Sequence, residues 1–449
     1  MYKQLNRQNI SPWLWVPTLY FVEGIPYFLV NEISVLMFTK MGVPNGQMAL
    51  FTSLLYLPWV IKPFWSPFID IIKTKRWWIV AMQLAIAVIL VLLALTLPHP
   101  DAATIATTQT PISLFSLTLV LFIITAFASA THDVAADGFY MLALSQKNQS
   151  AFVGIRSMFY RLSNIFGNGL LVMLAGLLEQ RDGLDVPAAW QWTLGITAIG
   201  FTLLALYHSF IVPQPAADRP HLADHATASP RLIIKEFART FVTFFSKKGV
   251  WLAILFMLLY RLPEAFLLKM CKPFLLAAHE SGGLAMQTAD VGLAYGTVGV
   301  VALTLGGILG GIYASHVGLR KALWPMAACM TLPCFTFVYL SIYCPTSLVL
   351  ISAAIAIEQF GYGFGFTAYM LYMMYFSEGQ FKTSHYAFCT CFMALSMMVP
   401  GMFAGYIQET LGYRDFFWMV IVCCIVTVAV TTMAYKKVSP EYGMKKTID

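Results

Sequence analysis

The sequence predicts an all-α integral membrane protein with twelve transmembrane helices. Of its 449 residues, 59% are hydrophobic and only 11% carry a charged side chain, whereas soluble domains average about 25% charged residues. The hydrophobic residues gather into runs of the roughly 20 residues that cross a bilayer. A chain so poor in charge cannot cover a water-facing surface, so the composition excludes an ordinary soluble protein.

The apolar runs give the positions of the helices. We predict spans at about 12–38, 46–69, 77–98, 113–139, 151–178, 189–212, 249–277, 289–313, 321–343, 347–376, 386–408 and 415–435. Pro26, Pro58 and Pro263 fall inside these spans. A membrane helix tolerates such prolines because neighbouring helices can satisfy the carbonyl groups that they leave free.

The lysines and arginines outside the spans lie mainly on alternate connecting segments. They gather at the N-terminus, in the turns after spans 2 and 8, in a long central linker and in the C-terminal tail. The segments between hold Lys40, Arg181 and Arg414, and the loop 99–112 has neither lysine nor arginine. Because positive charge stays on the cytoplasmic side, we predict that both termini are cytoplasmic.

The longest hydrophilic segment divides the spans into two sets of six. We predict a six-helix bundle in residues 1–212, a cytoplasmic linker in 213–248 and a second six-helix bundle in 249–449. A faint internal repeat, Leu19–Pro26 against Leu259–Glu264, makes the two bundles pseudo-symmetric. This six-plus-six plan is that of the major facilitator superfamily.

The end of the linker, from Arg231 to Lys248, has an amphipathic pattern. Its apolar side carries Leu232, Ile233, Phe237, Phe241, Phe244 and Phe245. Such a helix lies in the membrane interface with its apolar side buried among the lipids. We therefore expect this segment to lie along the inner membrane surface.

Ionisable residues also fall inside the spans, where a charge costs about 3 kcal/mol or more. The basic ones are Lys62, Arg156, Arg161, Arg261, Lys269 and Lys272, and the acidic ones are Glu23, Glu32, Asp133, Asp137, Glu264 and Glu358. Helical spacing places several of them on shared faces, such as Asp133 and Asp137 at i and i+4. We expect them to line a wet cavity, to pair with each other, or both.

The residues near mid-membrane are the candidates for substrate or proton binding, because a purely structural ion pair is expensive there. Arg161 and Arg261 can bind carboxylate groups through two parallel hydrogen bonds. A carboxyl group in an apolar setting favours its protonated form unless a cation lies beside it, which makes Glu23 and Glu358 the candidates for the transported proton. The other predicted substrate-binding residues are Glu264, Lys269, Tyr27, Tyr160 and Tyr362, the tyrosines because they share faces with charges and can stack on a sugar.

For Lys269 and Lys272, near the predicted outer mouth, attraction of anions and simple extension to the interface are equally good explanations.

The charges near the cytoplasmic ends of the spans predict a gate. Asp133, Asp137 and Arg156 favour an ion-pair network over direct substrate contact. The turn after span 2 carries Asp70 and Arg76, which we expect to latch the two halves together. Lys62 either joins that latch or pairs with Asp133 or Asp137.

No motif predicts an enzyme, a metal site or a bound cofactor. The eight cysteines lie mostly in apolar runs without zinc-binding spacing. The chain has no Gly-Lys-Ser/Thr phosphate loop, no His-Glu-x-x-His motif and no Gly-x-Ser-x-Gly elbow. A membrane sensor or an intramembrane enzyme therefore remains only a remote alternative, and we expect no nucleic-acid partner.

The stretch Lys62-Pro63-Phe64-Trp65-Ser66-Pro67-Phe68-Ile69-Asp70 resembles the Lys-Phe-x-Trp-Ser/Ala-Pro-x-x-Asp signature of the AmpG-type muropeptide permeases, relatives of the acetyl-CoA transporters. Tyr160–Leu162 agrees as well, and Leu259–Phe266 looks like the family's Tyr-Lys-x-x-Asp-Ala-Phe. Ile357–Gly363 is similar to its Glu-Asn-x-x-x-Gly pattern. The resemblance covers most of the chain.

This resemblance implies a monomeric importer in the lipid of a bacterial inner membrane. It would be driven by a proton gradient, without a bound cofactor, and would carry anhydro-muramyl disaccharides, with or without peptide, for peptidoglycan recycling. Glu23 stands where the permeases tend to have serine, and Arg261 and Glu264 replace a lysine and an aspartate. These departures leave open another anionic substrate, such as an acetyl-CoA or nucleotide conjugate, a siderophore or a drug.

Overall fold

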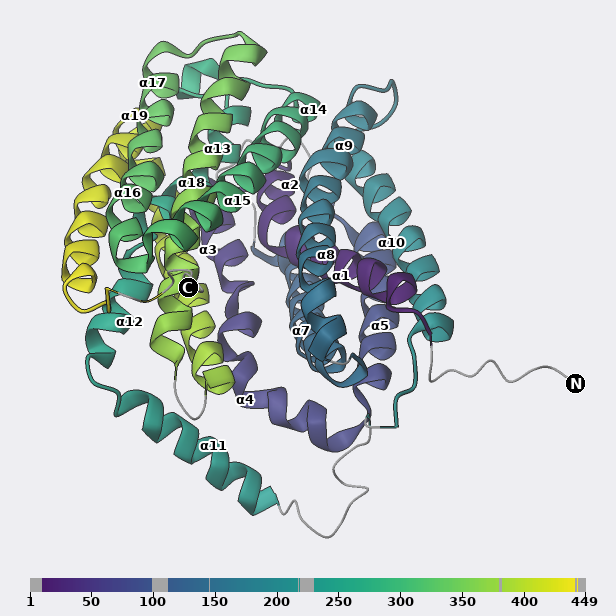
Figure 1. Cartoon of the computed structure of the whole chain (residues 1–449). Helices are drawn as coiled ribbons and strands as arrows, with labels where there is room; N and C mark the ends of the chain where they lie inside the picture. The colour runs from purple at the N-terminus through teal and green to yellow at the C-terminus, as the bar shows by residue number, and fades with distance from the viewer. Residues whose placement is uncertain are drawn as a thin grey trace, which may run out of the picture. The chain divides into compact units, whose positions relative to one another are not determined.

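The computed structural model describes residues 10–98, 112–144, 146–216, 218, 230–378, 382–440 and 442. Every regular element within these residues is a helix (Figure 1), so the predicted all-α class is confirmed. Ten of the helices among the described residues are long and apolar enough to cross a membrane.

The chain divides into two compact units, and the boundaries fall within α2 (Ser34–Lys40), α4 (Leu57–Ile72) and α11 (Pro230–Phe245). Unit 1 takes in the described residues of Met1–Met37 and Ile61–Lys235. Its helices are α1 (Pro12–Phe28), η1 (Leu29–Ile33), α5 (Lys75–Thr96), α7 (Ile112–Ala143), α8 (Gln146–Asn164), η2 (Ile165–Leu171), α9 (Val172–Glu179) and α10 (Val186–Ile211).

Unit 2 takes in the described residues of Phe38–Val60 and Glu236–Asp449. Its helices are α3 (Asn45–Leu54), α12 (Val250–Leu259), α13 (Leu262–Leu276), η4 (His279–Ser281), α14 (Thr288–Val291), η5 (Gly292–Gly299), α15 (Val300–Val317), α16 (Leu319–Thr331), η6 (Leu332–Cys334), α17 (Phe335–Tyr343), α18 (Leu348–Ser377) and α19 (Lys382–Tyr435).

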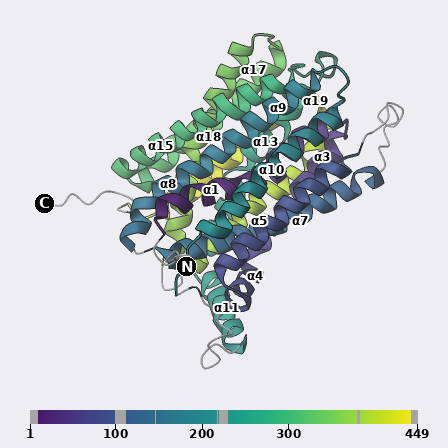
Figure 2. The same cartoon turned by 90° about the vertical axis from the view of Figure 1, so that its right-hand side faces the viewer.

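In unit 1, α5 packs between α7 and α10, and α5 and α7 lie side by side (Figure 2). A chain of buried polar groups ties these helices to α1: His132 bonds Gln83 at 2.9 Å, Gln83 bonds His208 at 3.0 Å, and His208 bonds Thr18 at 2.9 Å. Each of these groups needs a partner because an unsatisfied polar group in an apolar core is costly. This hydrogen-bonded network therefore constrains how α1, α5, α7 and α10 pack.

Small residues allow close helix contacts in unit 2. A Cβ atom at Gly306 on α15 would lie 2.1 Å from the carbonyl oxygen of Phe360 on α18, and one at Gly363 would lie 2.1 Å from that of Leu303. Neither position can hold a larger side chain without moving the backbones apart. Such close packing replaces the hydrophobic driving force that helices lack inside a bilayer.

Two predicted spans are interrupted, each within five residues of a proline that the sequence analysis places inside the span. The second, 46–69, is divided into α3 and α4 by a turn at Leu55–Tyr56. The seventh is divided into α12 and α13 at Tyr260–Arg261, just before Pro263. The carbonyl group of Tyr260, at this break, accepts a hydrogen bond of 3.0 Å from Thr427 on α19, so a neighbouring helix satisfies a backbone group where the helix is interrupted.

The amphipathic segment of the linker forms α11, which extends from Pro230 to Phe245 (Figure 1). Phe244 is completely buried in the core of unit 2, 5.3 Å from Phe388 and 5.5 Å from His385 between ring centroids. For Phe244, the predicted position on the membrane surface is therefore wrong. The pattern detected an apolar face but could not distinguish lipid from protein as its neighbour.

Candidate functional site

Unit 1 holds a cluster of three acidic and two basic side chains, which we call the carboxylate cluster. Glu23 comes from α1, Asp133 and Asp137 come from adjacent turns of α7, and carboxylate oxygens of all three lie within 4.8 Å of one another. Lys62 on α4 donates to Asp133 at 2.5 Å, and Arg156 on α8 pairs with Asp137 at 2.6 Å. The contact of Lys62 with Asp133 is one of the two pairings that the sequence left open.

Glu23 is the member without a cationic partner of its own. Its side chain is buried, and its Oε2 atom has no hydrogen-bond partner among the described residues. Tyr20, one helical turn earlier, donates to Asp137 at 3.2 Å, and the guanidinium group of Arg156 lies 4.3 Å from the centre of the Tyr20 ring. Three carboxyl groups therefore face two cations, and one proton would balance the cluster.

Three carboxylate oxygens so close together are also compatible with a metal ion. Hard cations such as Ca²⁺ prefer oxygen ligands of this kind. Here Lys62 and Arg156 already place positive charge on Asp133 and Asp137. The pairing of two of the three acids with Lys62 and Arg156 thus favours ion pairs over a metal at this cluster.

A second group of predicted site residues lies farther along α1 and α8. The rings of Tyr27 and Tyr160 are 6.4 Å apart, and Arg161 is half-buried with no hydrogen-bond or ion-pair partner among the described residues. The π-helical segments η1 and η2 follow directly, joined by a hydrogen bond of 2.8 Å from Asn168 to Glu32. Such π-helical segments are frequent at functional sites.

In unit 2 the break between α12 and α13 places Arg261 among aromatic rings. Its guanidinium group donates to the hydroxyl of Tyr362 and lies 4.7 Å from the centre of the Phe366 ring and 5.8 Å from that of Tyr369. Arg261 is buried. A planar guanidinium group stacks well on aromatic rings while its remaining donors can bind a carboxylate.

Two buried acids accompany Arg261, and we call them the acid pair. Glu264 and Glu358 are both 1% exposed, and Glu264 lies within electrostatic range of Glu358 and of Arg261. Glu358 accepts a hydrogen bond of 2.8 Å from Gln359. Among the described residues, both carboxyl oxygens of Glu264 and the Oε1 atom of Glu358 have no hydrogen-bond partner. Open acceptors of this kind call for a proton or a ligand.

Each of the two lysines on α13 contacts a neutral group. Lys269 donates to Thr52 at 2.9 Å, and the amino group of Lys272 lies 5.0 Å from the centre of the Tyr295 ring. Both side chains are buried. Neither therefore extends freely to an interface, one of the two explanations offered by the sequence.

The predicted latch residues have different outcomes. The side chain of Asp70 lies outside the described residues. Arg76 donates to the backbone oxygens of Ser209 and Val212 at 2.5 and 3.0 Å, at the C-terminal end of α10. A cation at that position stabilises the free carbonyl groups of a helix end. This contact gives Arg76 a structural role within unit 1, and its role in a gate stays a prediction.

Sequence reasoning missed several partners of these charges, among them Tyr20, Gln359 and Thr52. Tyr20 precedes Glu23 by three residues, so helical spacing could have placed it on the same face. Thr52 is 217 residues away from Lys269, and nothing in a single sequence indicates that contact.

Ion pairs and ionisable groups buried within membrane helices are typical of the pathways of membrane transporters. Comparison with known proteins agrees. The sequence model of the Major Facilitator Superfamily matches residues 18–381. The chain belongs to this superfamily of transporters, and it is a multi-pass membrane protein.

The curated relatives identify a narrower resemblance. The anhydromuropeptide permease of Escherichia coli K12 is 22% identical over 432 residues, covering 94% of this chain and 80% of that protein. A putative transporter AmpG 4 of Rickettsia felis is 24% identical over 429 residues, covering 93% and 95%. The resemblance to AmpG-type permeases and the predicted location in a bacterial inner membrane are confirmed.

Solved structures show the same fold. A bacterial homologue of the human lysosomal transporter Spinster, in an inward-facing and unoccupied conformation, has a TM-score of 0.71 at 14% identity and covers 97% of this chain and 98% of that chain. A D-xylose–proton symporter has a TM-score of 0.71 at 10% identity and covers 95% and 98%.

Proposed function

We propose that the protein is a proton-coupled symporter that imports an anionic, sugar-containing solute by alternating access, with anhydro-muropeptides as its substrate class. The substrate class comes from the relatives named as permeases for these compounds. The observation that supports proton coupling is the carboxylate cluster, in which, among the described residues, Glu23 is buried beside two further acids that are paired with two cations.

The topology we propose has twelve spans with both termini in the cytoplasm. Ten candidate spans are present among the described residues. One of them, His385–Tyr435, contains Gly412 with a φ of 74°, a value that interrupts a helix, and so divides into two. The interrupted segment of α3 and α4 supplies the twelfth. In this proposal six spans precede the linker and six follow it, although the compact units group α3 with the helices that follow the linker.

For the proton, we propose Glu23 in unit 1 and Glu358 in unit 2. Two ionised acids within 4.8 Å of a third repel it strongly in a medium of low dielectric constant. In the carboxylate cluster a proton on Glu23 removes that repulsion without breaking either ion pair. In the acid pair, a proton on Glu358 or Glu264 lets one carboxyl group donate where both have open acceptor positions.

For the substrate, we propose Arg161 and Arg261 as the anion-binding groups. Arg161 is half-buried without a partner among the described residues, and Arg261 is held flat by aromatic rings. A guanidinium group can bind a carboxylate through two parallel hydrogen bonds, and the peptide and muramyl parts of the proposed substrates carry carboxylates. Tyr160 and Tyr362, beside these arginines in sequence or space, offer rings for the sugar. Tyr27, Glu264 and Lys269 complete the proposed substrate residues.

For the gate, we propose the ion pairs of Lys62 with Asp133 and of Arg156 with Asp137. The first pair joins α4 to α7, and the second joins α8 to α7. The acids of both pairs belong to the carboxylate cluster. A change in the protonation of Glu23 therefore changes the electrostatic balance of both pairs. This connection would let proton binding alter the conformation, which coupled transport requires.

Uptake into membrane vesicles tests the proposal. Labelled anhydro-muropeptide should accumulate when the outside is more acidic, up to about tenfold per pH unit for each proton carried. A sodium gradient of the same size should have no effect, which separates proton coupling from a cation bound by the three acids. Glu23→Gln should still exchange labelled for unlabelled solute but lose accumulation. Uptake indifferent to the pH gradient would contradict the proton coupling, and no uptake of any muropeptide would contradict the substrate class.

A further inference from the structure

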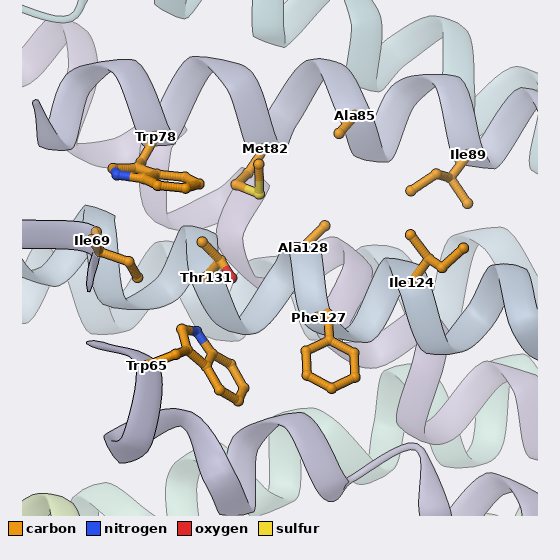
Figure 3. A pocket seen from close by; sticks show the side chains of 10 residues that line it. All are labelled: Trp65, Ile69, Trp78, Met82, Ala85, Ile89, Ile124, Phe127, Ala128 and Thr131. Carbon is orange, nitrogen blue, oxygen red and sulfur yellow. The ribbon is translucent and has the colours of Figure 1, made fainter. Parts of the chain in front are cut away.

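Two places in the described structure differ in the ligands that they can hold. A groove of about 420 Å³ in unit 1 is lined by Trp65, Ile69, Trp78, Met82, Ala85, Ile89, Ile124, Phe127, Ala128 and Thr131 (Figure 3). None of these ten side chains is charged, so the groove offers no partner to an ionic group. In unit 2, by contrast, Arg261 and the acid pair bring charges of both signs close together.

The opposite charges at the start of α13 are close but not joined by a hydrogen bond. Arg261 and Glu264 are three residues apart, a spacing at which Cβ atoms lie about 5–6 Å apart in a helix. Nevertheless, neither carboxyl oxygen of Glu264 has a hydrogen-bond partner among the described residues. The guanidinium group of Arg261 donates instead to the hydroxyl of Tyr362 and lies 4.7 Å from the centre of the Phe366 ring. A ligand with two opposite charges can therefore meet Arg261 with its anionic end and Glu264 with its cationic end.

A single proton does not satisfy the open oxygens of the acid pair. Among the described residues, both oxygens of Glu264 and the Oε1 atom of Glu358 have no partner, whereas the Oε2 atom of Glu358 accepts from Gln359 at 2.8 Å. The two carboxyl groups lie within hydrogen-bond reach of each other. A proton on the Oε1 atom of Glu358 is donated to one oxygen of Glu264, and that bond uses two of the three open positions. One oxygen of Glu264 and one negative charge remain.

The charges of this site favour a ligand group with no net charge. Arg261 and an acid pair that holds one proton sum to zero. A carboxylate alone would leave a negative charge in excess among three side chains that are at most 5% exposed, and an uncompensated buried charge is costly. A group that carries both a carboxylate and an ammonium adds no net charge and gives a partner to Arg261 and to Glu264.

We propose, on the basis of the proposed function, that this site recognises a free α-amino-acid group on the imported solute. The carboxylate of that group binds Arg261, its ammonium donates to the remaining oxygen of Glu264, and Glu358 holds the proton. An α-amino acid carries both charges on one carbon atom, so it can bridge two side chains that are one helical turn apart. The substrate class is then an anhydro-muropeptide whose peptide carries a free α-amino-acid group, in preference to the disaccharide without peptide.

Calorimetric titration of the full-length protein in detergent tests this assignment with three ligands. The first is an anhydro-muropeptide with a free amino-acid group on a diaminopimelate residue, the second is the same compound acetylated on that amino group, and the third is the disaccharide without peptide. Acetylation removes the ammonium charge and keeps the carboxylate. The wild-type protein should bind the free compound at least about tenfold more tightly than the acetylated one, the effect of one hydrogen bond to a charged group.

Three variants separate the charge of the ammonium from the bulk of the acetyl group. Glu264→Gln removes the negative charge at nearly constant size, so the preference should fall below about twofold while the acetylated compound still binds. Glu358→Gln should keep the preference, because its amide group donates to Glu264 as the protonated carboxyl group does. The matched control Glu409→Gln changes an acid of α19 that accepts from the backbone of Gly46 at 2.7 Å, and it should keep the preference as well.

The outcomes distinguish this inference from the proposed function. Equal binding of the free and acetylated compounds by the wild-type protein would overturn the inference, while binding of the disaccharide would leave the proposed function in place. A preference that persists in Glu264→Gln would come from the bulk of the acetyl group and would also overturn it, as would loss of the preference in Glu358→Gln. Absence of binding of all three ligands would contradict the proposed function and this inference together.

Discussion

Removing Lys62 should destabilise the protein more than removing any exposed lysine. Lys62→Gln leaves Asp133 without the cation 2.5 Å away and leaves three carboxyl groups facing Arg156 alone. Breaking one partner of a buried ion pair costs about 3–5 kcal/mol. Because the Lys62 and Asp133 side chains are 24% and 20% exposed, we expect the lower end, about 3 kcal/mol.

The second substitution in this series should restore the balance. The double variant Lys62→Gln with Asp133→Asn again has one carboxyl group more than its cations, as the wild type has. Replacing both members of a buried pair is often close to neutral. We therefore expect the double variant to regain more than half of the stability that Lys62→Gln loses. The single variant Asp133→Asn differs from it because it leaves Lys62 without its partner.

Thermal unfolding of the purified variants in one detergent measures this series. A loss of about 3 kcal/mol corresponds to a decrease in Tm of about 6–12 °C for a unit of this size. Lys73→Gln, which removes an exposed lysine, should stay within about 0.5 kcal/mol of wild type. A Lys62→Gln protein as stable as the Lys73→Gln control would refute the reasoning, as would a double variant no more stable than Lys62→Gln.

Three further predictions concern unit 2. Arg261→Lys keeps the charge but loses the planar group over Phe366, so muropeptide uptake should fall at least tenfold while Tm stays near that of wild type; unchanged uptake would exclude this arginine from the site. Gly306→Ala should lower the yield of folded protein because its Cβ atom would meet a backbone oxygen at 2.1 Å, whereas Gly311→Ala, in open space, should not. Phe244→Ala should lower the free energy of unfolding by about 3–5 kcal/mol because it leaves a cavity in the core. A loss below about 0.5 kcal/mol would instead support the predicted position of Phe244 on the membrane surface.

The sequence predicts those features of the fold that depend on length and polarity. The apolar runs locate the membrane helices because each must reach across about 30 Å of hydrocarbon. They do not locate the break at Leu55–Tyr56, where hydrophobicity continues without interruption, and at Tyr260–Arg261 the charged and proline residues mark an irregular site without showing that the helix ends there. The break at Tyr260–Arg261 matters for the site because Arg261 lies in it, with its guanidinium group close to the rings of Phe366 and Tyr369.

For the site, the sequence predicts which charges are expensive and therefore require an explanation. It places Asp133 and Asp137 on one helix face through their spacing, and it names Lys62 as a partner for either. It cannot choose between them, because the choice depends on how α4 and α7 pack. The contact of Lys269 with Thr52 depends on tertiary structure in the same way, since 217 residues separate them.

The two units use the same kind of acid in different settings, and the difference suggests how substrate and proton are coupled in the proposed cycle. In unit 1 the acids are held by Lys62 and Arg156. In unit 2, Arg261 lies within electrostatic range of Glu264, one member of the acid pair, and it faces aromatic rings. A carboxylate of the substrate on Arg261 would neutralise that cation and add a negative charge beside Glu264 and Glu358, so proton uptake by the pair would become more favourable. By linkage, a proton on the pair would equally strengthen substrate binding. An anionic solute and a proton would then bind together, which is what a symporter requires.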